Sequence, residues 1–171
     1  MTLLRYNQKV KKEIIKWLET NRISNPINVT LTEKQYLHKT VGKDKRVFKL
    51  DKFNSSQNFR HFRNVLNRKV FGKSYHRYNK QLDMLVVREV SSQTNRLHLH
   101  LIIEQPQHYD FNSFRNEIER IWINSNFGFS EIHIEKPTTL DREDGWFYYI
   151  MKSNIENTID WNNTFLSDCR L

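Results

Sequence analysis

Two histidines one residue apart are the side chains of this sequence best suited to bind a metal ion. His98 and His100 alternate with apolar residues in Leu97–Glu104, a pattern typical of a β-strand. Side chains of a strand alternate between its faces, so both imidazoles lie on one face, about 7 Å apart along the strand. Glu89 precedes a polar run, 91–95, that predicts a turn, and a slightly staggered hairpin would bring its carboxylate across from the imidazoles. Two imidazoles and one carboxylate suit Mg²⁺ or Mn²⁺ as well as Zn²⁺.

A tyrosine further along the chain could act as a nucleophile beside such an ion. Tyr149 and Lys152 lie three residues apart in a segment that begins with carboxylates at Asp141, as helices often do. On a helix these two side chains share a face and can reach one phosphate. Tyr148 stands at the edge of the apolar side and is a competing nucleophile. A lone His-x-His, glutamate or tyrosine pair is more often structural, so the hypothesis depends on their occurring together and in this order.

These motifs resemble those of the HUH endonucleases, in particular their replication-initiator (Rep) branch. Residues 98–100 match the histidine-hydrophobic-histidine signature, and residues 149–152 read Y-x-x-K, similar to a Rep motif that follows the histidines. The resemblance covers roughly residues 25–156. It implies single-stranded DNA nicking and joining that initiates rolling-circle replication of a plasmid, phage or virus genome. An origin hairpin and a host replication helicase are the partners that it implies, and Mn²⁺ or Mg²⁺ is the cofactor.

The resemblance also implies a role for each residue of the motifs. A cation held by His98, His100 and Glu89 would draw charge from the scissile phosphate. Tyr149 would attack phosphorus and leave a 5′-phosphotyrosine and a free 3′-hydroxyl, with Lys152 stabilising the developing charge. His38 and His133 are the fallback ligands if Glu89 does not serve.

A second group of residues is expected to contact DNA. The strand 27–32 is similar to a Rep strand linked to DNA recognition, and residues 33–52 form a lysine-rich loop or small ribbon available to phosphates. Residues 73–80 mix basic and aromatic side chains, which suit phosphates and stacked bases, although a plain loop often has this composition. The predicted DNA-binding residues are Thr30, Thr32, Lys73, Tyr75, Arg77, Tyr78 and Arg96.

The distribution of charge agrees with a nucleic-acid partner. Residues 1–80 carry 20 Lys and Arg against 5 Asp and Glu, and residues 81–171 carry 8 against 14, which together give the net charge of +9. A basic half beside an acidic half predicts a phosphate-binding surface next to a carboxylate-bearing one. A solvated basic face is the simpler explanation of the same composition.

The order of predicted elements indicates an α+β fold. Strand, helix, strand, strand, helix, strand is the ferredoxin-like βαββαβ plan, with a central antiparallel sheet that places the histidines on a middle strand. An N-terminal helix precedes this plan and a C-terminal catalytic helix follows it. The expected divisions are an N-terminal basic amphipathic helix in 1–24, an endonuclease domain in 25–157 and a C-terminal tail in 158–171. The helix beginning at the cap 54–56 is expected to end near Gly72.

Composition narrows the class of protein. The single cysteine excludes an internal disulfide and a cysteine-based zinc site, and fits the cytoplasm, or the nucleus for a protein of a eukaryotic virus. No apolar run approaches the length that spans a membrane, so no membrane partner is expected. No helicase domain is present in these residues, which favours a minimal initiator or an excised nuclease domain.

Two alternatives stay open. One is a single-tyrosine HUH transposase, which resembles Y-x-x-x-Q around its tyrosine and is therefore disfavoured by Lys152. The other is a non-catalytic ferredoxin-like module that binds single-stranded nucleic acid and needs no metal. The sequence leaves the origin, the physiological metal, the host and the oligomeric state open.

Overall fold

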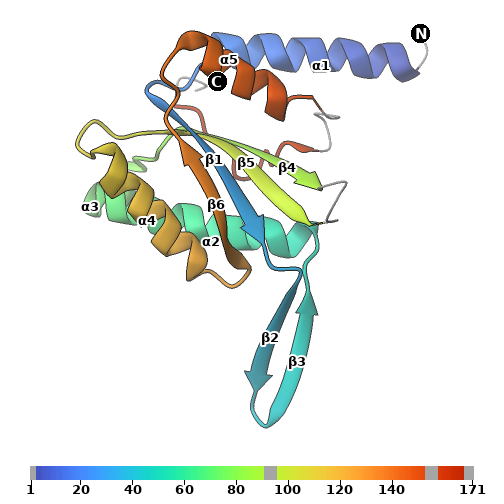
Figure 1. The fold of residues 1–171 in the computed structure, drawn as a ribbon, viewed down its shortest axis with the longest axis vertical. Coiled ribbons are helices and arrows are strands. Elements are labelled where there is room, and N and C mark those ends of the chain that lie inside the picture. Colours follow the sequence, from blue (N-terminus) through green and yellow to red (C-terminus); the bar gives the residue numbers. More distant parts are fainter. Residues whose placement is uncertain (1–2, 91–95, 153–157, 168–171) are drawn as a thin grey trace.

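A four-stranded antiparallel sheet between two layers of helices forms the body of this α+β protein (Figure 1). The computed structural model describes residues 3–90, 96–152 and 158–167. The helices α1 and α5 cover one face of the sheet, and α2 and α4 cover the other. The elements in chain order are α1 (Leu3–Thr20), β1 (Pro26–Glu33), β2 (Tyr36–Val41), β3 (Asp44–Lys49), α2 (Lys52–Phe71), α3 (Lys73–Tyr78), β4 (Met84–Val90), β5 (Leu97–Glu104), α4 (Phe111–Ile123), β6 (Gly128–Glu135) and α5 (Leu140–Ile150).

The strand order places the histidine strand in the middle of the sheet. The order is β4-β5-β1-β6, and each neighbouring pair is antiparallel. The predicted strand Leu97–Glu104 has the predicted bounds, and it pairs on one side with β4 and on the other with β1. This topology is compatible with the ferredoxin-like plan.

Two apolar clusters fill the spaces between the layers. The larger cluster joins the sheet to α2 and α4, with Phe59, Phe62 and Trp122 fully buried against strand residues such as Leu99 and Leu101. The smaller cluster joins the opposite face of the sheet to α1 and α5. Its buried members are Leu18, Leu85, Val87, Ile150, Met151 and Ile159. Apolar side chains are thus needed on both sheet faces, and polar residues in the strands stand out as exceptions.

The first and last segments of the chain belong to the domain body. Helix α1 contributes Leu18 to the smaller cluster, so it packs beside α5 and is not a separate arm. The predicted C-terminal tail lies, over residues 158–167, along the edge strand β4. The Met84 N–H donates to the Phe165 carbonyl at 2.7 Å, and the Phe165 N–H donates back at 2.8 Å. An edge strand has unpaired backbone groups, and this segment satisfies part of them.

Several predicted boundaries were wrong. The cap of α2 is Asp51, which accepts from the Asn54 N–H at 2.7 Å, while Ser55 of the predicted cap is buried inside the helix. Residues 73–78 form the short helix α3, which was not predicted, and α5 ends at Ile150, before Lys152. The predicted turn 91–95 lies outside the described residues, as do residues 153–157.

No helix within the described ranges combines the length and the apolar character that crossing a membrane requires.

Candidate active site

The register of the sheet gathers five polar side chains on the face that α5 covers. Glu89 of β4 lies directly opposite His98 of β5, so the carboxylate needs no stagger of the hairpin to reach the imidazoles. On the other side of β5, Thr32 lies opposite His98 and Thr30 opposite His100. Directly opposed residues point to the same face, so all five side chains share it.

The threonine hydroxyls orient both imidazole rings. Thr30 Oγ1 lies 3.0 Å from His100 Nδ1, and Thr32 Oγ1 lies 3.1 Å from His98 Nδ1. The two rings are nearly parallel, with an interplanar angle of 16° and centroids 6.4 Å apart. Because each Nδ1 is engaged by a hydroxyl, each Nε2 is the nitrogen available to a ligand. Metal-binding histidines are usually held by such a hydrogen bond at the second nitrogen.

The surroundings of His100 favour its neutral form. His100 is buried, and this burial, with a smaller contribution from the neighbouring charges of His98 and Lys152, lowers its pKa although the carboxylate of Glu89 opposes the shift. An uncharged imidazole keeps the lone pair that a metal ligand must offer. His100 Nε2 lies 2.9 Å from Glu89 Oε2, which brings a nitrogen and an oxygen donor together at one point.

The two imidazoles and the Glu89 carboxylate are suitable ligands for a divalent cation. Across 3–90, 96–152 and 158–167, no three His, Cys, Asp or Glu side chains already have the spacing of metal ligands. Protein partners satisfy both oxygens of Glu89, since Oε2 contacts His100 and Oε1 lies 3.0 Å from Lys152 Nζ. Two oriented imidazoles beside a carboxylate are nevertheless donors that Mg²⁺, Mn²⁺ or Zn²⁺ accepts.

The two fallback ligands occupy different places. His133 of β6 lies opposite Thr30, on the face of the imidazole pair, with its Nε2 3.6 Å from Glu135 Oε2. His38 belongs to β2, in the separate two-stranded ribbon. Only His133 therefore shares the sheet with the imidazole pair.

Helix α5 places Tyr149 against His100. The Trp146 indole N–H donates to the Leu101 carbonyl at 3.2 Å and so ties the helix to β5. The Tyr149 ring lies edge-on to His100 with centroids 5.8 Å apart, and it stacks on Trp146 at 5.5 Å. Tyr149 is 45% exposed, so a substrate can reach its ring. The sequence prediction did not include Trp146, although its position three residues before Tyr149 puts both on one helix face.

Tyr148 points towards a different partner. Its hydroxyl donates to Glu19 of α1, and this hydrogen bond to a carboxylate raises the pKa of Tyr148. A phenol with a raised pKa is a poorer source of phenolate. Position and hydrogen bonding thus both favour Tyr149 over Tyr148 as the residue beside the imidazoles.

Lys152 connects the tyrosine to the carboxylate. Its Nζ lies 3.8 Å from the centroid of the Tyr149 ring and 3.0 Å from Glu89 Oε1. Partial burial lowers the pKa of Lys152, but the hydrogen bonds to Glu89 and Tyr149 and the negative charges of these groups together raise the pKa above its ordinary value. The amine is therefore a cation at neutral pH. Although α5 ends at Ile150, the Lys152 N–H donates to the Tyr149 carbonyl at 3.2 Å and keeps the two residues together.

The predicted DNA-binding residues are divided among three places. Thr30 and Thr32 hold the imidazoles, and Thr32 is only 1% exposed, so positioning fits its surroundings better than DNA contact. Arg96 stacks over Phe129 of β6, with its guanidinium carbon 5.1 Å from the ring centroid. The remaining four residues, Lys73, Tyr75, Arg77 and Tyr78, lie on α3, beside the end of α2 and away from α5 (Figure 1).

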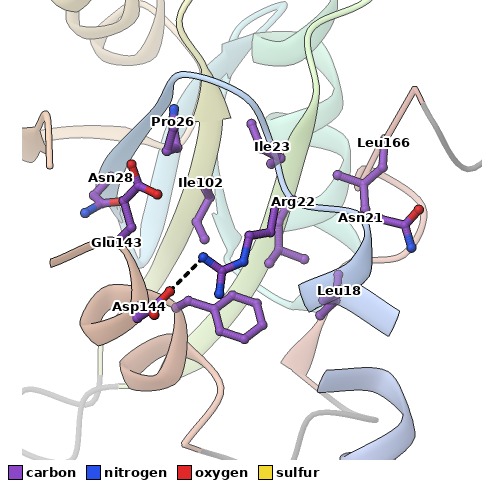
Figure 2. Close-up of a pocket in the computed structure, with 12 residues that line it drawn as sticks. Leu18, Asn21, Arg22, Ile23, Pro26, Asn28, Ile102, Glu143, Asp144 and Leu166 are labelled. Carbon is purple, nitrogen blue, oxygen red and sulfur yellow. Dashed lines mark ion pairs between the residues drawn. The ribbon is translucent and has the colours of Figure 1, made fainter. Parts of the chain in front are cut away.

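A small apolar pocket lies next to the candidate active site, on the same sheet face. Figure 2 shows it between the end of α1, the start of α5 and the strands, with the ion pair Arg22–Asp144 at its rim. Asn28 and Ile102 line it, and they are the next inward-facing pair after Thr30 and His100. Its lining lacks the imidazoles and the tyrosine, so it is a neighbour of the site and not a part of it.

Comparison of the chain with protein-family models, with curated proteins and with solved structures found no match.

Proposed function

We propose that this protein is a metal-dependent endonuclease and strand transferase of the HUH type, built on a ferredoxin-like fold, that nicks single-stranded DNA. The observation that carries the proposal is the meeting of Tyr149 with His100, which lie 5.8 Å apart between ring centroids although they belong to different elements. Sequence motifs alone do not require this proximity. The resemblance to Rep proteins supplies the reaction class, and the basic half of the chain supports a DNA substrate.

The roles of the residues follow from their contacts. His98, His100 and Glu89 would hold the cation, which when bound would withdraw charge from the scissile phosphate and orient it. Thr30 and Thr32 keep the two Nε2 atoms directed at that position. The carboxylate of Glu89 must then turn from Lys152 towards the cation, which frees the ammonium for the phosphate.

Tyr149 would carry the covalent step. Its hydroxyl oxygen forms a bond to phosphorus, the bond between phosphorus and the 3′-oxygen breaks, and the leaving oxygen takes up a proton as the phenol gives one up. The product is a 5′-phosphotyrosine and a free 3′-hydroxyl. Lys152, cationic at neutral pH, stabilises the phenolate and the negative charge that develops on phosphate.

A trapping experiment tests this proposal without knowledge of the natural site. The protein is incubated with a randomised single-stranded DNA library and Mn²⁺ and then denatured, and the DNA that stays attached is sequenced and its peptide mapped. We expect an adduct on Tyr149 that is lost in Tyr149→Phe, His98→Ala and with EDTA, and kept in the matched control Tyr148→Phe. An adduct that survives Tyr149→Phe, or that forms equally in EDTA, would contradict the mechanism.

A second trapping, with single-stranded fragments of plasmid, phage and mobile-element DNA in place of the randomised library, separates the biological settings. Recovery of a replication origin supports initiation of rolling-circle replication. Recovery of mobile-element ends supports the transposase alternative instead. Binding of DNA without any adduct, unaffected by His98→Ala or His100→Ala, would favour a non-catalytic binding module.

A further inference from the structure

A two-stranded ribbon extends from the body of the protein directly after the strand that carries Thr30 and Thr32. The strands β2 and β3 pair only with each other, and Figure 1 shows them leaving the sheet at the end of β1. A two-residue turn, Gly42-Lys43, joins them, with Gly42 at a φ of 65°, as expected for a tight hairpin turn. With six residues in each strand, the ribbon is about 20 Å long.

The ribbon carries an excess of positive charge that is not neutralised by ion pairs among the described residues. Residues 36–49 contain five basic residues and one carboxylate, which gives the ribbon a net charge of +4. Among the described residues none of these cations takes part in an ion pair, and Lys39 lies directly opposite Arg46. Like charges in directly opposed positions destabilise a hairpin. A polyanionic partner would relieve this repulsion. The five cations are Lys39, Lys43, Lys45, Arg46 and Lys49.

The cations occupy both faces of the ribbon. Lys39 and Arg46 share one face, while Lys45 and Lys49 lie on the other, opposite Thr40 and Tyr36. A flat anionic surface such as a membrane would attract a single charged face. Walls of phosphate on two sides, as in a groove of duplex DNA, would engage both faces.

Shape and apolar exposure favour a duplex over a single strand. The major groove of B-form DNA admits a two-stranded ribbon, whereas single strands bind in a groove of the protein. The ribbon is a projecting rod with exposed apolar side chains, including Val47 at 58% exposure and Tyr36 at 53%. An isolated two-stranded hairpin is only marginally stable in water, so a partner that covers these side chains would also order it.

We propose that the β2–β3 ribbon is a duplex-binding arm that enters the major groove of paired DNA adjoining the single strand held at the active site. This inference rests on the proposed function, because it takes DNA to be the substrate. Only three residues separate Thr32, which orients His98, from the first residue of β2, Tyr36. Paired DNA on the ribbon therefore places an adjoining unpaired strand close to Tyr149. The arm would select a hairpin origin over a plain single strand.

The test measures binding in EDTA, so that cleavage plays no part. Fluorescence anisotropy compares two labelled DNAs, a hairpin with a stem of about 20 base pairs and an unpaired strand of equal length. The ribbon variant is Lys39→Gln/Lys45→Gln/Arg46→Gln in the full chain. The control removes three exposed cations from α1 and is Lys9→Gln/Lys12→Gln/Lys16→Gln.

We expect the ribbon variant to lose at least tenfold in affinity for the hairpin and less than threefold for the unpaired strand. The slope of log affinity against log salt for the hairpin should fall by about 2 to 3, because about 0.9 of a counterion is released per phosphate contact. The α1 control should change less than threefold on both DNAs. Equal losses on both DNAs, no loss on the hairpin, or an equal loss in the control would overturn the proposal.

The two proposals fail in different measurements. Circular dichroism and thermal unfolding establish that the ribbon variant is folded, which is expected because its three side chains are exposed. If the wild-type protein binds the hairpin but forms no Tyr149 adduct, the endonuclease proposal alone is refuted. An intact adduct with hairpin binding unchanged in the ribbon variant would refute the arm alone.

Discussion

Replacing Glu33 with glutamine should remove a large part of the pH dependence of folding stability. Glu33 ends β1 on the face towards α2 and is 1% exposed. Its Oε2 accepts a hydrogen bond from Ser55 Oγ at 2.6 Å, while Oε1 lacks a partner among the described residues. Burial raises the pKa of Glu33 from 4.5 to about 7, and the hydrogen bond from Ser55 opposes this only in part.

The sign and the size of the effect follow from this pKa. Between pH 4.5 and 7 the folded protein keeps the Glu33 proton that the unfolded chain releases, so stability falls as pH rises through this window. The contribution is fully present below the unfolded pKa and lost above the folded one. The difference between the two pKa values corresponds to about 3 kcal/mol in the free energy of unfolding.

Urea unfolding between pH 4.5 and 8 measures this contribution. Glu33→Gln keeps an oxygen that accepts from Ser55 and cannot ionise. It should match the wild type near pH 4.5 and exceed it by about 3 kcal/mol at pH 8. Glu13→Gln, at an exposed position in α1, is the control and should follow the wild type at every pH. A stability difference between Glu33→Gln and wild type that stays constant with pH would refute a protonated carboxylate at this position.

Three further substitutions test the site and its support. Thr32→Val should weaken Mn²⁺ binding about 10- to 100-fold by calorimetry, because it removes the hydroxyl that orients His98; unchanged affinity would show that the ring holds its own orientation. Asp160→Ala should lower the free energy of unfolding by about 3 to 5 kcal/mol in urea, because it removes the carboxylate that pairs with the largely buried Arg88. A loss below about 1 kcal/mol would mean that water reaches that guanidinium. Trp146→Phe should slow adduct formation while leaving the melting temperature almost unchanged, because the lost indole hydrogen bond fixes α5 over the imidazoles. A fall in melting temperature large enough to account for the slower reaction would show that Trp146 only stabilises the fold.

Periodicity alone predicted the strand that carries the imidazoles. The alternation in Leu97–Glu104 assigned Leu97, Leu99, Leu101 and Ile103 to the core face; the last three are fully buried, and Leu97 packs half-buried against the same cluster. The prediction succeeded because a strand has only two faces, so alternating apolar residues determine which face joins the larger apolar cluster. The same rule assigned His98 and His100 to a common face without any tertiary information.

Helix boundaries depended on contacts that a local pattern does not contain. Ser55 looked like part of a cap, yet its hydroxyl donates to the buried Glu33, and Asp51 caps α2 instead. The Asn-rich segment from residue 158 onward was predicted to be a tail, but residues 158–167 belong to the domain body. Their backbone pairs with the edge of β4, and such pairing places no requirement on side-chain pattern.

The sequence by itself determined the α+β class, the common face of the two imidazoles and the basic character of the first half of the chain. Only the tertiary structure determined that Thr30 and Thr32 engage the imidazoles, that Tyr149 and not Tyr148 lies against His100, and that the lysine-rich segment projects as a ribbon. The physical reason is that face and period are properties of a single strand or helix. The partner of a side chain depends on which elements the sheet register and the helix packing bring together.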